Sequence, residues 1–147
     1  PKQLRAIISN LTGKQSQTYP VYSSKAVEGK PLWKWAKEAA LDQIKIPSHE
    51  VEIYNLEMIE EQQIQASDLL ADVTSRINKV SGDFRQADII QDWEKVLTTA
   101  PQLKYVSIRT KVSSGTYIRQ LAMDIGKKLN LPACCWHIHR EQVHVKT

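Results

Sequence analysis

The sequence predicts an α/β (α+β) domain in which a mixed β-sheet is flanked by helices and carries an inserted helical hairpin. Apolar and polar residues alternate from Tyr105 to Val112, as in a strand with one buried face. From Ile118 onward the apolar residues recur at helical spacing instead. Residues 61–102 contain two further amphipathic patterns that predict helices. A chain of 147 residues is long enough to bury a core.

The first fifty residues predict two helices separated by an extended segment. A first helix should end at Gly13, and its apolar face is formed by Leu4, Ile7, Ile8 and Leu11. Pro20 restrains the residue before it, so residues 17–23 are expected to be extended. Proline suits the first position of a helix, and a second helix should therefore begin at Pro31. Its apolar residues are Leu32, Trp35, Ala36, Ala39 and Ala40.

Pro47 should end that helical region, and a strand should begin near Val51. The apolar positions change phase after Ile53, which suggests a bulge or burial on both faces. In the insertion, one helix should be capped by Ser67 and stop near Gly82, and the next should stop before Pro101. Their apolar residues are Leu69, Leu70, Val73, Ile77 and Val80 in the first helix, and Ile89, Ile90, Trp93, Val96 and Leu97 in the second.

The strand 105–112 leads through a turn at residues 113–115, where a hydroxyl is available to cap a helix, to Arg119 in the first turn of that helix. A cation at this end opposes the helix dipole, at a cost of about 0.3–1 kcal/mol. No acidic residue lies shortly before Arg119, and Asp124 lies more than a turn beyond it. Arg119 is therefore expected to face a phosphate, or a carboxylate from elsewhere in the fold.

The net charge of +4 is unevenly distributed. Residues 1–50 hold eight Lys and Arg against four Asp and Glu, and residues 103–147 hold eight against two. The middle, 51–102, holds four against ten. Basic flanks suit a polyanion such as RNA, although this net charge is also ordinary for a soluble domain. We expect a cytoplasmic protein, because the sequence has no transmembrane stretch or signal peptide and only two adjacent cysteines.

The run from Gly115 to Arg119, Gly-Thr-Tyr-Ile-Arg, resembles a motif of the TruB-type pseudouridine synthases, which isomerise a uridine in the TΨC loop of tRNA. Three further blocks resemble this family in the same order. They lie within residues 13–32, with Gln17, Pro20, Tyr22 and Ser23; within 46–54, with Pro-Ser and Ile-Tyr; and within 133–140, which ends in Ile138-His139-Arg140. The resemblance covers residues 3–60 and 103–145.

The resemblance implies a pseudouridine synthase-like partial catalytic domain that binds RNA, specifically tRNA, and needs no cofactor. It implies catalytic roles for Arg119 and Tyr22, with Arg119 paired to an aspartate and Tyr22 stacked on the flipped base. It also places Tyr22, Tyr117, Ile138, Arg140 and Lys25 around the uridine. Three positions depart from the family pattern: Tyr19 replaces a proline, Lys25 lies one residue early, and His139 replaces an arginine.

The family's catalytic aspartate lies in a Gly-Thr-Leu-Asp-Pro segment, and none of the seven aspartates here has that context. We therefore expect residues 1–147 to form one partial catalytic domain, inactive alone, with 61–102 as an acidic helical insertion. The missing N-terminal half would be its partner. Two alternatives are a non-catalytic RNA-binding module and one chain of a split enzyme. Cys135, His137 and His139 alternate but have no fourth ligand nearby, so no metal site is predicted.

Overall fold

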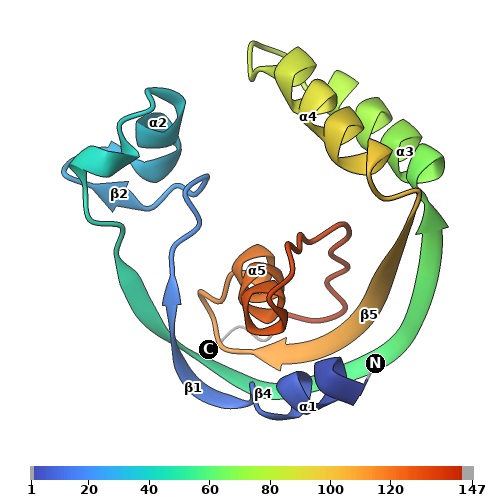
Figure 1. Ribbon diagram of the computed structural model, residues 1–147. Helices are drawn as coiled ribbons and strands as arrows, with labels where there is room; N and C mark the ends of the chain where they lie inside the picture. The colour runs from blue at the N-terminus through green and yellow to red at the C-terminus, as the bar shows by residue number, and fades with distance from the viewer. Residues whose placement is uncertain (1, 144–147) are drawn as a thin grey trace. The chain divides into compact units, whose positions relative to one another are not determined.

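The computed structural model describes residues 2–143, which form two compact units (Figure 1). Unit 1 contains the described residues up to Glu57 and from Arg109 onward, and unit 2 is Met58–Ile108. Antiparallel strands combine with separate helices, which confirms the α+β class. The elements are α1 (Lys2–Ser9), β1 (Gly13–Thr18), β2 (Ala26–Val27), β3 (Lys30–Pro31), α2 (Leu32–Lys37), the 3₁₀ helix η1 (Leu41–Gln43), β4 (Ser48–Gln65), α3 (Ala66–Asn78), α4 (Gln86–Thr98), β5 (Gln102–Val112) and α5 (Ile118–Leu129).

The sheet of unit 1 has the strand order β1-β4-β5. Strand β1 pairs antiparallel with β4, in a register that runs from Gly13 opposite Ile53 to Thr18 opposite Ser48. The buried positions on β4 change phase as the sequence predicts, from Val51 and Ile53 to Leu56. Helices α1 and α5 pack against each other. The core of this unit is apolar: Ile8, Leu11, Leu32, Ala40, Val51, Ile53, Leu56, Leu121 and Ile125.

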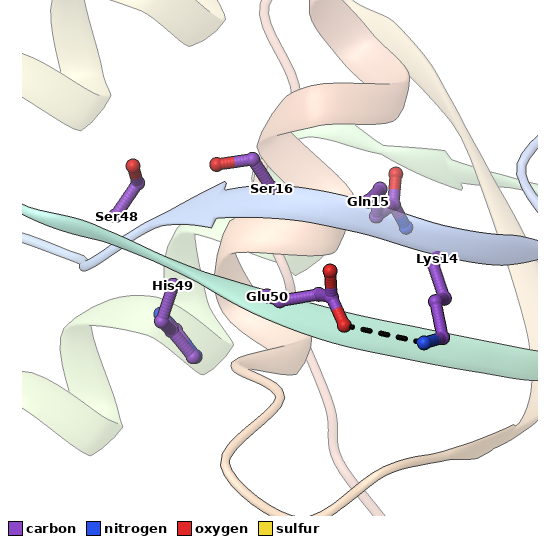
Figure 2. Close-up of a pocket in the computed structure, with 6 residues that line it drawn as sticks. All are labelled: Lys14, Gln15, Ser16, Ser48, His49 and Glu50. Carbon is purple, nitrogen blue, oxygen red and sulfur yellow. Dashed lines mark ion pairs between the residues drawn. The ribbon is translucent and has the colours of Figure 1, made fainter.

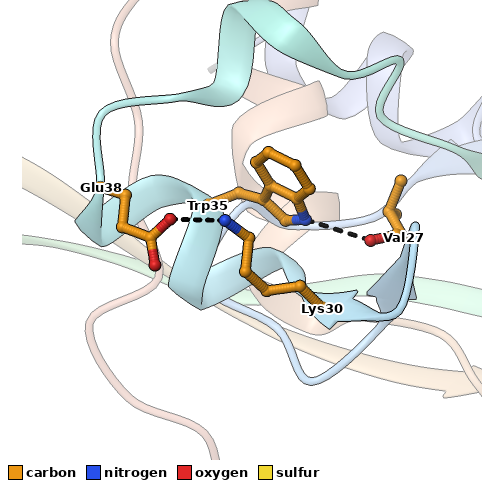
Figure 3. A network of polar contacts seen from close by, with 4 residues as sticks. All are labelled: Val27, Lys30, Trp35 and Glu38. Carbon is orange, nitrogen blue, oxygen red and sulfur yellow. Dashed lines mark hydrogen bonds and ion pairs between the residues drawn. The ribbon is translucent and has the colours of Figure 1, made fainter.

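A small hairpin, β2 and β3, precedes α2 in the same unit. Its two turn residues, Glu28 and Gly29, both have positive φ, +51° and +77°, as type I′ hairpin turns require. Figure 3 shows how the hairpin holds α2: the indole Nε1 of Trp35 donates to the carbonyl of Val27 at 3.1 Å. Lys30 lies over the Trp35 ring, 3.5 Å from its centroid, and pairs with Glu38.

Unit 2 contains the predicted helical hairpin. Helices α3 and α4 pack side by side, and each buries one leucine, Leu69 and Leu97. The strand segments that lead into and out of the hairpin are joined by an ion pair of 3.0 Å between Lys104 and Glu61. The two helices and their order were predicted correctly.

Several predicted boundaries are wrong. Helix α1 ends at Ser9, because Gly13 already pairs within β1. Helix α2 starts after Pro31 and ends at Lys37, and Ala39 has φ +52°, which no right-handed helix accommodates. Strand β4 begins at Ser48, earlier than expected, and extends to Gln65.

The hydroxyl caps predicted at Ser67 and within residues 113–115 are also wrong. The residue before α3 is Gln65, the residue before α5 is Tyr117, and neither caps its helix through a side chain. Beyond α5, residues 131–143 have no regular secondary structure, so the strand alternation considered for Cys135 and His137 does not apply there. Among residues 2–143, none of the helices has the length and hydrophobicity needed to cross a bilayer.

Candidate functional site

The loop between β5 and α5 is tied to the sheet of unit 1 by several hydrogen bonds. Ser113 donates its backbone N–H to the carbonyl of Glu52 at 2.8 Å, and its hydroxyl accepts from the N–H of Glu52 at 2.9 Å. Thr116 Oγ1 donates to the carbonyl of Ser113 at 2.8 Å. Gly115 has φ +83°, and its carbonyl lies 3.0 Å from His49 Nε2. These contacts anchor the loop to β4 at Glu52 and His49.

The side chain of Gln17 holds the next part of this loop. Its Oε1 accepts the backbone N–H of Tyr117 at 2.8 Å, and its Nε2 donates to the carbonyl of Tyr117 at 3.2 Å. Gln17 is only 2% exposed, although glutamine is usually a surface residue. Both polar atoms of this buried amide are therefore satisfied by one main-chain segment.

Arg119 follows two residues later, at the second position of α5. It is exposed, and its Nη2 donates to the main-chain oxygen of Tyr22 at 3.4 Å. No acidic residue lies in the first turn of α5, and within residues 2–143 Arg119 forms no ion pair with a carboxylate. The phosphate or carboxylate expected opposite Arg119 is therefore not supplied by a carboxylate among residues 2–143. The guanidinium keeps the capacity to bind an anion.

Tyr22 is 49% exposed, and its backbone lies in a bend after β1. The hydrogen bond to Arg119 thus brings two of the predicted catalytic residues together, although they lie 97 positions apart. An exposed tyrosine whose main chain accepts from an exposed arginine is a combination suited to a nucleotide, which offers a flat base and a negative charge.

An aromatic cluster lies beside Gln17. Tyr19 stacks on His49 with centroids 4.1 Å apart, and Tyr117 meets the edge of Tyr19 at 5.7 Å. Lys25 Nζ lies over the Tyr19 ring, 5.1 Å from its centroid. Of the predicted pocket residues, Tyr117 and Lys25 therefore both reach this cluster through Tyr19, which replaces the proline of the family pattern.

Ile138 and Arg140 lie in the irregular segment after α5, and both are exposed, Ile138 by 53%. Within this segment, the Cys135 thiol lies in electrostatic range of Arg119. Burial raises the pKa of the Cys135 thiol, as does the neighbouring Cys134, whereas the Arg119 guanidinium lowers it. The structure does not bring Ile138 into a closed apolar wall beside Tyr22.

Among the described residues, no three His, Cys, Asp or Glu side chains are grouped closely enough to hold a metal ion. A shallow hollow on β1 and β4 is shown in Figure 2, with Lys14 and Glu50 paired at 3.5 Å. Both of those side chains are mostly exposed, so their ion pair is weak and their charges offset each other. It is lined by Lys14, Gln15, Ser16, Ser48, His49 and Glu50.

Sequence reasoning missed the roles of Gln17, Tyr19 and His49. Gln17 was visible as one member of the block at residues 13–32, and Tyr19 as a departure from it. Nothing in the local sequence indicated that a glutamine in β1 would bond to a residue 100 positions later. His49 gave no separate signal within the block at 46–54.

With this geometry in view, comparison with known proteins defines the class. Residues 1–84 match the TruB family pseudouridylate synthase (N terminal domain). The chain is 28% identical over 142 residues to tRNA pseudouridine synthase B of Syntrophomonas wolfei, covering 97% of this chain and 35% of the relative. It is 30% identical over 132 residues to the protein of that name from Deinococcus radiodurans, covering 88% and 39%.

The chain is also 28% identical over 131 residues to tRNA pseudouridine synthase B of Geobacillus thermodenitrificans, and this match covers 89% of this chain and 32% of the relative. The family match extends over more than half of the chain. The chain therefore belongs to the TruB family of pseudouridylate synthases. It spans about a third of the length of the curated relatives that it matches.

Proposed function

We propose that this chain provides the uridine-binding part of a pseudouridine synthase that acts on tRNA. The observation that carries the proposal is the position of Arg119. It lies at the start of α5, exposed and next to Tyr22, and no carboxylate within residues 2–143 pairs with it. The family membership of the chain supports the same reaction.

The proposed reaction breaks the bond between N1 of uracil and the ribose and forms a bond from C5 of the same base to that ribose carbon. The hydrogen on C5 is released as a proton and N1 takes up a proton, so the product is an isomer of the substrate and no cofactor is consumed. The target base must first leave the helical stack, because its reacting edge is covered in folded RNA. The site must therefore supply an ionised carboxylate and a surface for the extruded base.

In this proposal Tyr22 stacks on the extruded uracil and Arg119 holds the catalytic aspartate. An arginine within a few ångströms lowers the pKa of a carboxyl by about 1–3 units, which keeps it ionised and directed at the sugar. Tyr117 and Ile138 contact the base, and Lys25 and Arg140 neutralise nearby phosphates. The aspartate is supplied by polypeptide outside these 147 residues, either an N-terminal part of the same protein or a partner chain. A tRNA substrate is consistent with a cytoplasmic location.

A non-catalytic RNA-binding module is the second candidate. The same observation favours it, since Arg119 without a carboxylate within residues 2–143 could bind an RNA phosphate directly. Turnover distinguishes the two candidates, because a binding module stays inactive when the aspartate-bearing half is added. RNA binding itself is common to both.

Fluorescence anisotropy with a synthetic TΨC stem-loop RNA tests the shared part of the proposal. Base stacking is worth about 1–3 kcal/mol, so Tyr22→Ala should weaken binding by about 5-fold to 150-fold. Tyr54→Ala is the matched control, because Tyr54 in β4 is equally exposed, at 53%, and lies outside the site. Equal losses in the two variants, or no RNA binding by the wild type, would contradict the proposal.

A further inference from the structure

The side-chain amide of Gln17 makes the two hydrogen bonds that a main-chain residue of a neighbouring strand would make. It donates to the carbonyl of Tyr117 and accepts from the N–H of the same residue. A β-ladder makes this reciprocal pair of bonds with main-chain atoms, whereas here one side chain makes both. Because the Gln17 side chain is buried, losing its amide removes the partner that satisfies both the N–H and the carbonyl of Tyr117.

The residue opposite Gln17 acts on the same loop. In the β1–β4 register Gln17 lies directly across from His49. The His49 ring contacts the carbonyl of Gly115, two residues before Tyr117. A neighbouring pair of sheet side chains therefore holds both ends of the segment 115–117.

This segment sets the direction of Arg119. Tyr117 is the last residue before α5, with an extended backbone of φ −91° and ψ 106°. The helix starts at the next residue, so the placement of Tyr117 fixes the start of α5 and the origin of the Arg119 side chain. Arg119 itself contributes little to its own orientation, because its hydrogen bond to Tyr22 is long, at 3.4 Å.

We propose that Gln17 is a positioning residue for the uridine site: its amide fixes the main chain of Tyr117 and thereby aims Arg119. The inference rests on the proposed function for its role in RNA binding. The proposed positioning role needs both polar atoms of the Gln17 amide: Nε2 as the donor to the carbonyl of Tyr117, and Oε1 as the acceptor of its N–H. A merely space-filling role would require neither.

The first experiment compares Gln17→Met with Gln120→Met. Methionine keeps the volume of glutamine and removes its polar atoms. Gln120 is similarly buried, at 6%, but its Nε2 donates to Asp124 within α5, so it is a control for losing a buried amide. The readouts are hydrogen exchange of the Tyr117 amide, ¹⁵N relaxation of Arg119 Nε–H, and affinity for the TΨC stem-loop RNA.

We expect Gln17→Met to speed exchange of the Tyr117 amide by about 10-fold, to increase the mobility of Arg119 Nε–H, and to weaken RNA binding by about 10-fold. Gln120→Met should leave all three near wild type. Unchanged exchange at Tyr117, or faster exchange with unchanged Arg119 mobility and RNA affinity, would overturn the proposal. If the wild type bound no RNA, the proposed function would fail, but the exchange and relaxation data would still decide whether Gln17 positions Arg119.

A second variant, Gln17→Glu, remains informative if Gln17→Met does not fold. A protonated carboxyl has one donor and one acceptor, as the amide has, whereas a carboxylate has only acceptors. Exchange protection of Tyr117 in this variant should therefore recover as the pH falls and the buried carboxyl becomes protonated. Wild type measured over the same pH range is the reference, and it corrects for the pH dependence of exchange that does not come from position 17. If the exchange protection of the Tyr117 amide in Gln17→Glu did not change with pH relative to wild type, the donor atom at position 17 would not be needed. That result would contradict the proposal.

Discussion

Arg119 Nη2 donates to the main-chain oxygen of Tyr22 at 3.4 Å, which joins the start of α5 to the bend after β1. A bond of this length is weak, and a guanidinium has five N–H donors. Most of the hydrogen-bonding capacity of Arg119 is therefore still available. This is the arrangement expected of a side chain that binds a further anionic group and contributes little to folding.

If Arg119 serves binding rather than stability, removing its charge should hardly affect folding. Arg119→Met should change the free energy of unfolding by no more than about 0.5 kcal/mol, as is typical of an exposed side chain. Chemical denaturation monitored by tryptophan fluorescence measures this. A loss of about 2 kcal/mol or more would instead assign Arg119 a structural role.

Gly126 in α5 should not tolerate a side chain. A Cβ at this position would lie 2.6 Å from the Cβ of Ala133 and 2.8 Å from the carbonyl oxygen of Leu131. The overlap should cost about 1–3 kcal/mol. That outweighs the gain of about 1 kcal/mol that alanine brings to a helix.

Thermal unfolding of Gly126→Ala should therefore show a lower midpoint than wild type. Lys127→Ala, an exposed substitution in the same helix, should leave the midpoint nearly unchanged. A more stable Gly126→Ala would mean that residues 131–133 do not pack against α5 as described.

The turn of the β2–β3 hairpin offers a stabilising substitution. Glu28 has φ +51°, a conformation that costs most residues about 1–2 kcal/mol and asparagine less. Glu28→Asn should thus raise the free energy of unfolding by about 0.5–1 kcal/mol, since Asn-Gly is the preferred type I′ pair. Gly29→Ala should lower it, through strain alone, because nothing lies within 4 Å of the added Cβ. Urea titrations in which Glu28→Asn lost stability would contradict the turn geometry.

The pKa of the Cys135 thiol depends on how close this part of the segment 131–143 lies to Arg119. Burial raises the pKa of this thiol and the Arg119 guanidinium opposes the rise, so removing that cation should raise the pKa further. In a Cys134→Ser background, Arg119→Met should shift the pH profile of thiol alkylation to higher pH, because less thiolate is present at each pH. Arg109→Met is the control, since Arg109 pairs with Glu141 and is not among the groups that act on Cys135. If the alkylation profiles of Arg119→Met and of its Cys134→Ser parent coincided, the Cys135 thiol would not lie close to Arg119 as described.

The periodic parts of the fold could be predicted from sequence. β5, α5 and the α3–α4 hairpin all have apolar residues at the spacing of their structure, and a local pattern suffices for these. The ends of elements were less predictable. Ser67 was a plausible cap, but α3 already begins at Ala66. The helix 32–40 was shortened by the left-handed conformation of Ala39, which its alanines did not indicate.

Sequence motifs marked candidate site residues, whereas contacts that only the tertiary fold makes left no local signal. Arg119 and Tyr22 were identified from their motifs, and they lie together as a hydrogen-bonded pair. The bonds from Gln17 to Tyr117 join strands and loops 100 residues apart, and glutamine has no helical or strand preference that reveals such a bond. The path of residues 131–143 was equally hidden, because it depends on the contact of Ala133 with Gly126.

The most direct test of the central claim is tritium release from tRNA that contains [5-³H]uridine. The assay uses the 147-residue chain alone and the chain mixed with a polypeptide that carries the family's Gly-Thr-Leu-Asp-Pro segment, each as wild type and Arg119→Met. We predict release only from the mixture, and only when Arg119 is present. Release by the chain alone, or equal release from both mixtures, would contradict the claim that Arg119 holds an aspartate supplied from outside these residues.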